Sequence, residues 1–337
     1  MRVSVIGAGA WGTALAHVLA SGGNDVKLWA YEEEVAVAVN EHHQNTIYLP
    51  EINIHSGIIA SSSLPETLEG AEVVLSVSPS QVVRRVMSEA APYVPDDALI
   101  VSASKGIENN TLMLMNEVLE EVLSEAHKGR VAALSGPSFA KETALEMPTA
   151  VSLAASVPEV ANTLQEVFNT PFFRVYTLDD VVGVEVGGAL KNVIALAAGV
   201  ADGLGFGHNS RAALITRGIA EISRIGVELG ANPLTFMGLS GIGDLVLTCT
   251  GDLSRNRTVG MRLGKGEKLK DILSSMVAVA EGVKTCDSTV ALAKKIGVEM
   301  PIASKMWEVL HEEKNPQEGV EELMGRPLRR EFWHLES

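Results

Sequence analysis

A glycine-rich turn that follows a short β-rich run constrains the fold of this chain more than any other feature. The turn is Gly7-Ala8-Gly9-Ala10-Trp11-Gly12; residues 2–6 precede it as a strand pattern, and residues 13–20 continue as a helical pattern. In this G-x-G-x-x-G context Gly7 permits the turn, Gly9 lets a pyrophosphate approach the backbone, and Gly12 lets helix and strand pack closely. We therefore predict a dinucleotide-binding turn; the alternative is a turn that is merely rich in glycine.

Strand patterns recur through the first half of the chain, with helical patterns between most of them. They cover residues 25–30, 72–77, 98–103, 130–135, 149–154 and 172–177. This alternation predicts an α/β fold with an N-terminal Rossmann-type, mostly parallel sheet, whose ligands collect at the carboxyl ends of the strands. Helical patterns dominate from residue 181 to 323, so we expect a dinucleotide-binding domain at 1–180 and an all-helical, substrate-binding C-terminal domain at 181–337.

The second strand ends in an acidic run, Tyr31-Glu32-Glu33-Glu34, with no basic residue. An acid at this point of such folds binds the ribose hydroxyls of NAD, whereas a basic residue accommodates the 2′-phosphate of NADP. The run therefore favours NAD(H) over NADP(H). The alternative is that the glutamates only stabilise the first turn of the next helix.

Lys191 lies in the middle of a helical segment, residues 184–198, that is otherwise small and aliphatic. On a helix it shares a face with Gly187, Gly188 and Ile194. Two adjacent glycines cost about 0.8–1.0 kcal/mol each relative to alanine, which indicates that another group approaches the backbone there. Because desolvation lowers a lysine pKa, Lys191 is a candidate proton donor and acceptor near neutral pH. The alternative is a lysine that snorkels past a buried helix.

Further candidates follow the predicted strands. Ser78-Pro79-Ser80-Gln81 follows the third strand and Ser104-Lys105-Gly106 the fourth, although a lysine there is by itself more typical of a solvated loop. After the fifth strand, residues 136–141 predict a helix that Pro137 starts and whose first N–H groups face the cleft. We also expect Ser210 to cap a helix that ends near Leu229.

Two polar groups stand out in the second half. Asp244 lies among three glycines and aliphatic residues, so it is either a helix cap or the partner of a buried cation. Ser254 predicts a helix start, and Arg255, Arg257, Arg262 and Lys265 follow it without an intervening acid. A helix N-terminus with guanidinium groups suits a phosphate; the alternative is a solvated basic face.

Composition excludes several classes of function. A formal net charge of −15 opposes non-specific attraction to nucleic acid and to anionic membranes. Cys249 and Cys286 have no metal or redox spacing and are expected to be reduced, buried thiols of a cytoplasmic protein. The eight histidines show no metal-ligand spacing, so no metal is expected. We see no uninterrupted apolar run that predicts a membrane span.

The chain resembles the bacterial NAD(P)-dependent glycerol-3-phosphate dehydrogenase family along nearly its whole length. The matching segments are Gly7-Ala-Gly-Ala-Trp-Gly-Thr-Ala-Leu-Ala16, Tyr48-Leu-Pro50, Lys105-Gly-Ile-Glu108, Leu134-Ser-Gly-Pro-Ser-Phe-Ala140, Gly187-Gly-Ala-Leu-Lys-Asn192, Leu214-Ile-Thr-Arg-Gly218, Gly243-Asp-Leu-Val-Leu-Thr-Cys-Thr250, Leu253-Ser-Arg-Asn256 and Leu323-Met-Gly-Arg-Pro327. The resemblance implies interconversion of dihydroxyacetone phosphate and sn-glycerol 3-phosphate with NAD(P)H, for phospholipid synthesis.

The same resemblance implies a role for individual residues. Lys191 would be the general acid/base, with Asp244 in the same catalytic site. The substrate-binding residues would be Lys105, Gly136, Ser138, Lys191, Asp244, Ser254, Arg255 and Asn256. The cofactor-binding residues would be Gly7, Gly9, Trp11, Gly12, Lys105, Ala140, Arg255, Val279 and Glu281. This chain departs from the family at Ala10, where a hydroxyl residue is common, and at Tyr31, where a basic residue is common; both weaken an NADPH preference.

Two rival interpretations stay open on the sequence. One is a 2-hydroxyacid or ketopantoate-type reductase, which would not need the basic cluster at Arg255. The other is a non-catalytic nucleotide sensor, which would have no use for a lysine on an apolar helix face beside an acid. The sequence does not fix the oligomeric state, and a homodimer is compatible with it.

Overall fold

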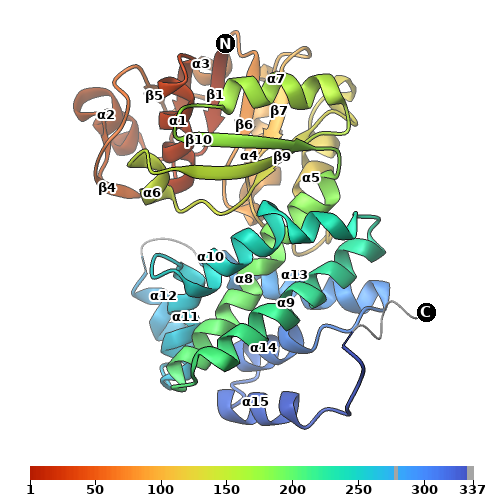
Figure 1. Ribbon diagram of the computed structural model, residues 1–337. Coiled ribbons are helices and arrows are strands. Elements are labelled where there is room, and N and C mark those ends of the chain that lie inside the picture. The colour runs from red at the N-terminus through yellow and green to blue at the C-terminus, as the bar shows by residue number, and fades with distance from the viewer. Residues whose placement is uncertain (277–279, 332–337) are drawn as a thin grey trace.

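An eight-stranded sheet occupies the first 178 residues of the chain in the computed structural model, which describes residues 1–276 and 280–331 (Figure 1). The strand order is β10-β9-β8-β7-β6-β1-β2-β5. The strands are β1 Arg2–Ile6, β2 Asp25–Trp29, β5 Ile59–Ser61, β6 Val73–Ser76, β7 Leu99–Ser102, β8 Ala132–Ser135, β9 Thr149–Ala154 and β10 Phe173–Leu178, and a separate hairpin pairs β3 Gln44–Asn45 with β4 Leu49–Asn53.

The sheet is parallel except where β8 meets β9. The carboxyl ends of β1, β2, β6, β7 and β8 therefore share one edge, while β9 and β10 run the other way. Central strands carry apolar residues on both faces because helices cover both sides: Val5 and Leu75 belong to the core on one face, and Ile6 and Val74 to the core on the other. The predicted α/β fold with a mostly parallel sheet is confirmed.

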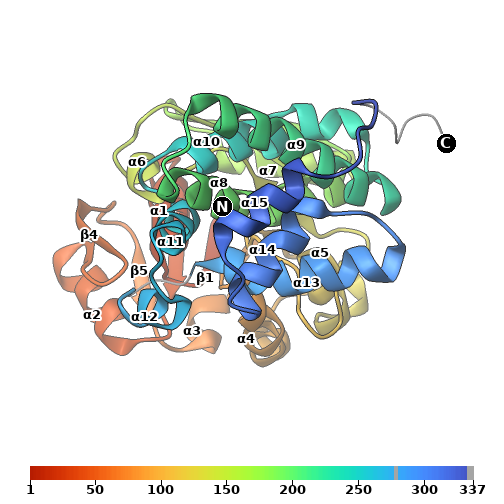
Figure 2. The same cartoon turned by 90° about the horizontal axis from the view of Figure 1, so that it is seen from below.

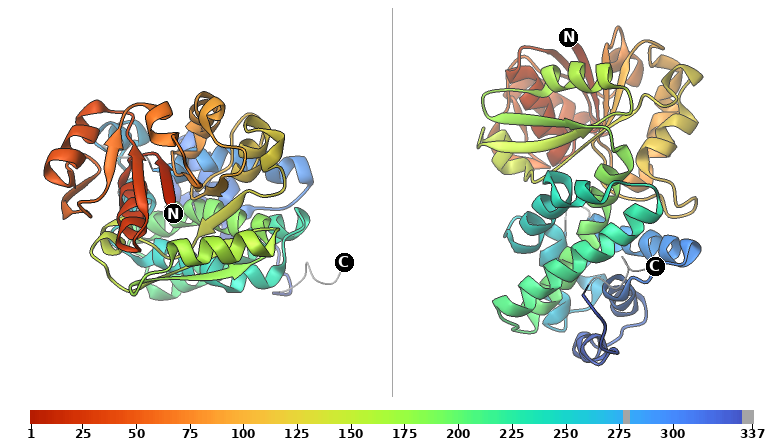
Figure 3. Two further views of the ribbon diagram at one scale, coloured as in Figure 1. Left: turned by 90° about the horizontal axis from the view of Figure 1, so that it is seen from above. Right: turned by 45° about the vertical axis from the view of Figure 1, so that its right-hand side comes forward.

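Helices pack on both faces of this sheet (Figure 3). Helices α1 Ala10–Ser21 and α7 Pro158–Phe168 share one apolar core with the sheet, and α3 Leu64–Leu68, α4 Val83–Ala90 and α5 Met115–Val122 share the other. The remaining helices of this half are α2 Glu33–His42 and α6 Ala140–Ala144, with the short turns η1 Ser80–Val82, η2 Ala91–Tyr93 and η3 Glu125–His127. The sequence patterns did not predict β3, β4 or β5, which are short and partly polar.

The described residues after 180 are helical. They form α8 Val181–Gly203, α9 His208–Glu228, η4 Pro233–Met237, η5 Leu239–Gly243, α10 Asp244–Thr250, α11 Arg255–Gly264, α12 Leu269–Ser274, α13 Glu281–Ile296, α14 Pro301–His311 and α15 Pro316–Met324. Helix α8 runs through the centre, where α9, α10, α11, α13 and α14 contact it (Figure 2). It also contacts β8 and β9, so its first turns lie against the sheet. That 1–180 and 181–337 are separate domains stays a prediction.

Glycines bring α8 and α11 together at backbone distance. A Cβ at Gly199 would overlap the carbonyl oxygen of Arg257, and a Cβ at Gly260 would overlap that of Leu196. Only glycine allows two helices to approach this closely without displacing a carbonyl. The contact fixes the position of α11 relative to α8, and with it the beginning of α11 at Ser254 and Arg255.

Two local predictions need correction. Pro137 does not start a helix, because α6 begins at Ala140 after an extended Phe139. Ser210 is not a helix cap, since α9 already begins at His208 with Gly207 as the cap position. Helix α8 is long and apolar enough to cross a membrane by length and composition alone, but Glu185 and Lys191 interrupt its apolar run, and nearly all of it is buried among its neighbours as in a core helix.

Candidate active site

A cluster of three charged side chains lies where α8 meets the sheet. Lys191 of α8 and Lys105, which follows β7, share the carboxylate of Asp244, the first residue of α10. Lys191 Nζ donates to one oxygen of Asp244, and Lys105 Nζ donates to the other at 2.8 Å. Asp244 is 1% exposed and Lys191 is 6% exposed. The prediction that Asp244 partners a buried cation is confirmed, and it partners two.

This arrangement leaves one net positive charge in a buried place. Burial lowers the pKa of Lys191 to about 7, with the Lys105 ammonium adding to the effect and Asp244 opposing it. Burial alone would raise the pKa of the Asp244 carboxyl, but the two ammonium groups outweigh it and lower that pKa. Lys191 can therefore hold or release a proton near neutral pH while Asp244 stays ionised.

Thr248 of α10 also belongs to the site, although no role was predicted for it from the sequence. Its hydroxyl accepts a hydrogen bond from Lys191 Nζ at 3.1 Å and donates its own proton to the Asp244 carbonyl at 2.6 Å. An ammonium has three N–H donors. Asp244 and Thr248 take two of them, which leaves the third for an oxygen of a ligand, as no other acceptor among the described residues bonds to Lys191. The spacing of Asp244 and Thr248, four residues apart on a helix, was the available signal.

The two glycines of α8 allow the surrounding backbone to close around Lys191. A Cβ at Gly187 would lie 2.5 Å from the Ser240 carbonyl oxygen in η5, and a Cβ at Gly188 would lie 2.5 Å from Ser135 Oγ at the end of β8. The expectation that another group approaches the helix here is confirmed. The approach of η5 places Asp244 on the Lys191 face of α8, and the approach of β8 joins the sheet to it.

The glycine turn has the shape that a dinucleotide needs. Gly7 has φ +129°, a conformation that side chains rarely adopt, and a Cβ at Gly12 would overlap the Gly7 carbonyl oxygen. A Cβ at Gly9 would meet no atom within 4 Å, so its backbone faces open space. Trp11 Nε1 is buried and has no hydrogen-bond partner among the described residues. The open backbone at Gly9 and the unpaired N–H of Trp11, both at the N-terminus of α1, fit a bound dinucleotide with its pyrophosphate against that backbone.

Lys105 links the glycine turn to the charged cluster. Its Nζ lies 5.9 Å from the centroid of the Trp11 ring, and it also donates to the Gly136 carbonyl at 3.2 Å. Ser138 Oγ donates to the same carbonyl at 2.9 Å. Gly136 has φ +151°, and Ala140 is the first residue of α6. The predicted residues after β7 and β8 therefore gather at one edge of the sheet beside the lysines.

The predicted basic cluster on α11 contains three arginines, of which two form ion pairs with acids and one does not among the described residues. Ser254 is the expected cap, since its Oγ accepts from the Arg257 backbone N–H at 3.2 Å. Arg257 pairs with Asp202 and Asp252, and Arg262 pairs with Glu267. The expectation of a shared phosphate site is wrong for these two side chains, because acids from other segments neutralise them. Arg255 has no ion pair within 4.0 Å among the described residues and is open to solvent.

Arg255 faces the beginning of α13. Glu281, its first residue, is enclosed there, and burial raises the pKa of Glu281 to about 7 although the Arg255 charge opposes the rise. Glu281 Oε2 is buried and has no hydrogen-bond partner among the described residues. Like Trp11 Nε1, this buried atom without a hydrogen-bond partner is consistent with a ligand that binds there, between α11 and α13. Val279, the other predicted cofactor residue here, lies outside the described residues.

Asn256 holds the elements together instead of pointing a free amide at the site. Its Nδ2 donates to Asn192 Oδ1 at 2.9 Å, and its Oδ1 accepts from the Gly282 backbone N–H at 2.9 Å. Asn192 is the neighbour of Lys191, so the bonds connect the lysine helix with the beginnings of α11 and α13. The structure thereby brings the Lys191 cluster, Arg255 and Glu281 into one region.

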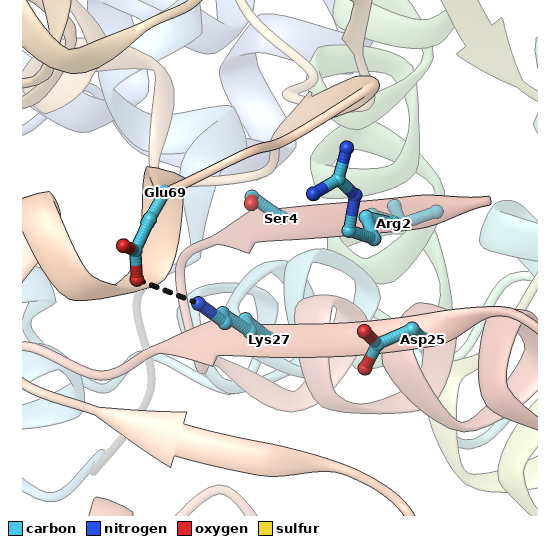
Figure 4. Close-up of a pocket in the computed structure, with 6 residues that line it drawn as sticks. Arg2, Ser4, Asp25, Lys27 and Glu69 are labelled. Atoms are coloured by element: carbon cyan, nitrogen blue, oxygen red, sulfur yellow. Dashed lines mark ion pairs between the residues drawn. The ribbon is translucent and has the colours of Figure 1, made fainter.

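A separate open pocket lies at the opposite edge of the sheet. It is lined by Arg2, Val3, Ser4, Asp25, Lys27 and Glu69. Figure 4 shows Lys27 and Glu69 pointing toward each other, with 3.8 Å between Nζ and Oε2. Glu69 follows α3, and the other lining residues come from the amino-terminal halves of β1 and β2, whereas the glycine turn follows the carboxyl end of β1. The pocket is therefore not the dinucleotide site.

Comparisons with known proteins agree over nearly the whole chain. The N-terminal and C-terminal models of NAD-dependent glycerol-3-phosphate dehydrogenase match residues 2–161 and 180–321. A relative from Geobacter sp. (strain M21), named glycerol-3-phosphate dehydrogenase (NAD(P)+), is 56% identical over 330 residues, which cover 98% of each chain.

Solved structures agree as well. The crystal structure of glycerol-3-phosphate dehydrogenase from Coxiella burnetii has a TM-score of 0.91 and 40% identity, covering 96% of this chain and 99% of that one. A PanE/ApbA family ketopantoate reductase from Ralstonia eutropha, at 16% identity, TM-score 0.58 and coverage of 95% and 100%, shares the fold alone. This chain belongs to the NAD-dependent glycerol-3-phosphate dehydrogenase family.

Proposed function

We propose that this chain interconverts dihydroxyacetone phosphate and sn-glycerol 3-phosphate with a nicotinamide cofactor, and that it supplies glycerol 3-phosphate for phospholipid synthesis in the cytoplasm. The observation that carries the reaction is the buried Lys191 ammonium, held by Asp244 and Thr248 with one N–H left for a ligand. Full-length relatives named for this reaction support the choice of substrate.

The glycine turn at residues 7–12 would hold the nicotinamide dinucleotide, which would supply the hydride for the ketone carbon. Negative charge then develops on the ketone oxygen, and Lys191 donates its free N–H to that oxygen and protonates it. Asp244 and Thr248 hold the ammonium so that this N–H points in one direction. In the reverse direction the neutral amine of Lys191 removes the hydroxyl proton.

Lys105 balances the strong pairing between Lys191 and Asp244. If Asp244 bonded Lys191 alone, the ion pair would hold the proton too tightly for transfer. Burial lowers the pKa of Lys191 to about 7, and the Lys105 ammonium, which bonds the same Asp244 carboxylate, adds to this lowering. The net positive charge of the cluster also favours an anionic substrate.

The phosphate of the substrate would bind at the beginning of α11. Arg255 is the α11 arginine without an acid partner among the described residues, and the first N–H groups of the helix face the same end. An anchored phosphate fixes the ketone relative to Lys191, so binding energy far from the reaction serves orientation.

The test compares a phosphorylated with an unphosphorylated ketone. Oxidation of NADH and of NADPH would be followed by absorbance with dihydroxyacetone phosphate and with dihydroxyacetone. We expect turnover with the phosphate ester, and Arg255→Ala should raise its KM by about 10–100-fold because a charged hydrogen bond is lost. Arg262→Ala is the matched control, since the Arg262 guanidinium already donates two hydrogen bonds to Glu267.

Two results would contradict the proposal. Equal use of both ketones, with no loss in Arg255→Ala, would favour a hydroxyacid-type reductase. Dinucleotide binding without oxidation by any ketone would indicate a nucleotide sensor.

We also propose a preference for NADH over NADPH. Glu32 follows the end of β2, where the adenosine ribose of a dinucleotide on the glycine turn is read. No basic side chain stands at Tyr31 or in residues 32–34 to receive a 2′-phosphate. The ratio of kcat/KM with the two cofactors tests the preference, and a clear advantage for NADPH would refute it.

A further inference from the structure

A chain of hydrogen bonds runs from the glycine turn to the acidic run through the β3–β4 hairpin. Asn45, which is fully buried, donates through Nδ2 to the Ala8 carbonyl and to Thr13 Oγ1, both at 2.8 Å. Its Oδ1 accepts from the Tyr48 backbone N–H at 3.0 Å. The hairpin is thus tied directly to the backbone of the turn on which the pyrophosphate would sit.

Tyr48 completes the connection. Its hydroxyl donates to Glu32 Oε1 at 2.7 Å, and this bond raises the pKa of the Tyr48 phenol, which therefore remains a donor at neutral pH. The Tyr48 side chain is itself half-buried against the sheet core. Glu33 and Glu34 are exposed and have no side-chain hydrogen bond among the described residues. Of the three glutamates in the run, Glu32 is the one held in place.

The placement of a carboxylate decides how it reads a ribose. A free glutamate at the surface can turn away from a 2′-phosphate, and ordering it to bind a hydroxyl costs side-chain entropy. A glutamate already held by Tyr48 accepts a hydrogen bond from a ribose hydroxyl without that cost. It also cannot rotate away from a 2′-phosphate, so it repels that phosphate. Fixing the acid therefore strengthens both the attraction for one cofactor and the repulsion of the other.

We infer that Tyr48 is a specificity-determining positioning residue, which holds Glu32 against the adenosine ribose and thereby sets discrimination between NADH and NADPH. The inference deepens the proposed NADH preference and rests on it. Tyr48 itself need not touch the cofactor, since it acts through Glu32. Nothing in the acidic run alone identifies it, because the two residues are 16 positions apart and meet only through the hairpin.

Titration of the full-length protein with NADH and NADPH, followed by nucleotide fluorescence without any ketone, tests the inference. We expect the wild type to bind NADH more tightly. Tyr48→Phe should reduce the ratio Kd(NADPH)/Kd(NADH) by about tenfold, the effect of one hydrogen bond to a charged group. Tyr93→Phe is the matched control: Tyr93 is exposed and has no hydrogen bond through its hydroxyl among the described residues, so the ratio should not change.

Glu32→Gln separates the charge of Glu32 from its position. The amide oxygen can still accept from Tyr48, so a fall in the ratio reports the lost charge alone. An unchanged ratio in Tyr48→Phe, with a lowered ratio in Glu32→Gln, would overturn the positioning role. A wild-type preference for NADPH would overturn it as well. Because no ketone is present, failure to reduce dihydroxyacetone phosphate would refute the proposed reaction without affecting this result, and thermal unfolding checks that each variant folds.

Discussion

The glycine turn and the Lys191 cluster lie at the same edge of the sheet but are built in opposite ways. The turn is made by six consecutive residues, and its function depends on backbone that a Cβ would block. The cluster takes side chains from α8, α10 and the loop after β7; Lys191 and Asp244 are 53 positions apart in the sequence, and Lys105 and Asp244 are 139 positions apart. One part binds through the backbone, and the other acts through charge.

The difference has a consequence for mutations. A change in the turn alters local geometry and should mainly affect binding of the dinucleotide. A change in the cluster leaves the backbone in place and should mainly affect proton transfer. Variants of the two regions therefore distinguish binding from proton transfer, and the largest effect is expected at Lys191.

Lys191→Ala should lower kcat by about 10²–10⁴-fold, because a positioned proton donor contributes that much. Affinity for the cofactor should be nearly intact, since Lys191 is not part of the turn. Stopped-flow turnover beside cofactor titration measures both. Lys294→Ala, at an exposed position on α13, is the control. A near-normal kcat would remove Lys191 from the chemistry and break the comparison.

Gly12→Ala should weaken binding of the dinucleotide by about 10–100-fold, since relieving an overlap with the Gly7 carbonyl costs about 1–3 kcal/mol. Fluorescence titration with NADH measures the change. Gly319→Ala on α15 is the control, because a Cβ there would meet no atom within 4 Å. If Gly12→Ala bound NADH normally and lost only kcat, the division between the two regions would be wrong.

The pH dependence should have opposite signs in the two directions. The pKa of Lys191 is lowered to about 7, so the ammonium needed for ketone reduction is present below that pH and is lost above it. We expect kcat/KM for reduction to fall about tenfold per pH unit above 7, while kcat/KM for alcohol oxidation rises up to the same pH and then levels. Parallel profiles in both directions would point to the substrate phosphate instead, whose ionisation is common to both.

Thr248→Val should have the smallest effect of the four. It removes a hydrogen-bond acceptor of Lys191 without changing the charges, so we expect kcat to fall by about tenfold or less. Thr250→Val on the same helix is the control, because that hydroxyl is exposed and, among the described residues, bonds only to the Val246 carbonyl. A loss as large as that of Lys191→Ala would mean that Thr248 takes part in the proton transfer itself.

Features that depend on neighbouring residues were predicted well. Seven of the eight strands of the main sheet, the glycine turn and the Ser254 cap follow from local patterns, and the structure confirms each. The short strands β3 to β5 were missed because runs of two to five partly polar residues carry little periodicity. The prediction that Arg257 belongs to a phosphate site was wrong because Arg257 pairs with Asp202, which lies 55 positions away in another helix.

The amino-acid sequence by itself determined the glycine turn, the order of strands and helices, and the presence of a lysine on an apolar helix face. These depend on backbone sterics and on hydrophobic periodicity, which act over a few residues. The tertiary structure decided which acid meets Lys191, that Lys105 shares it, that Arg255 is left without an acid partner among the described residues, and that Tyr48 holds Glu32. Such choices depend on burial and on distances between side chains from separate segments, and these exist only when the helices have packed against the sheet.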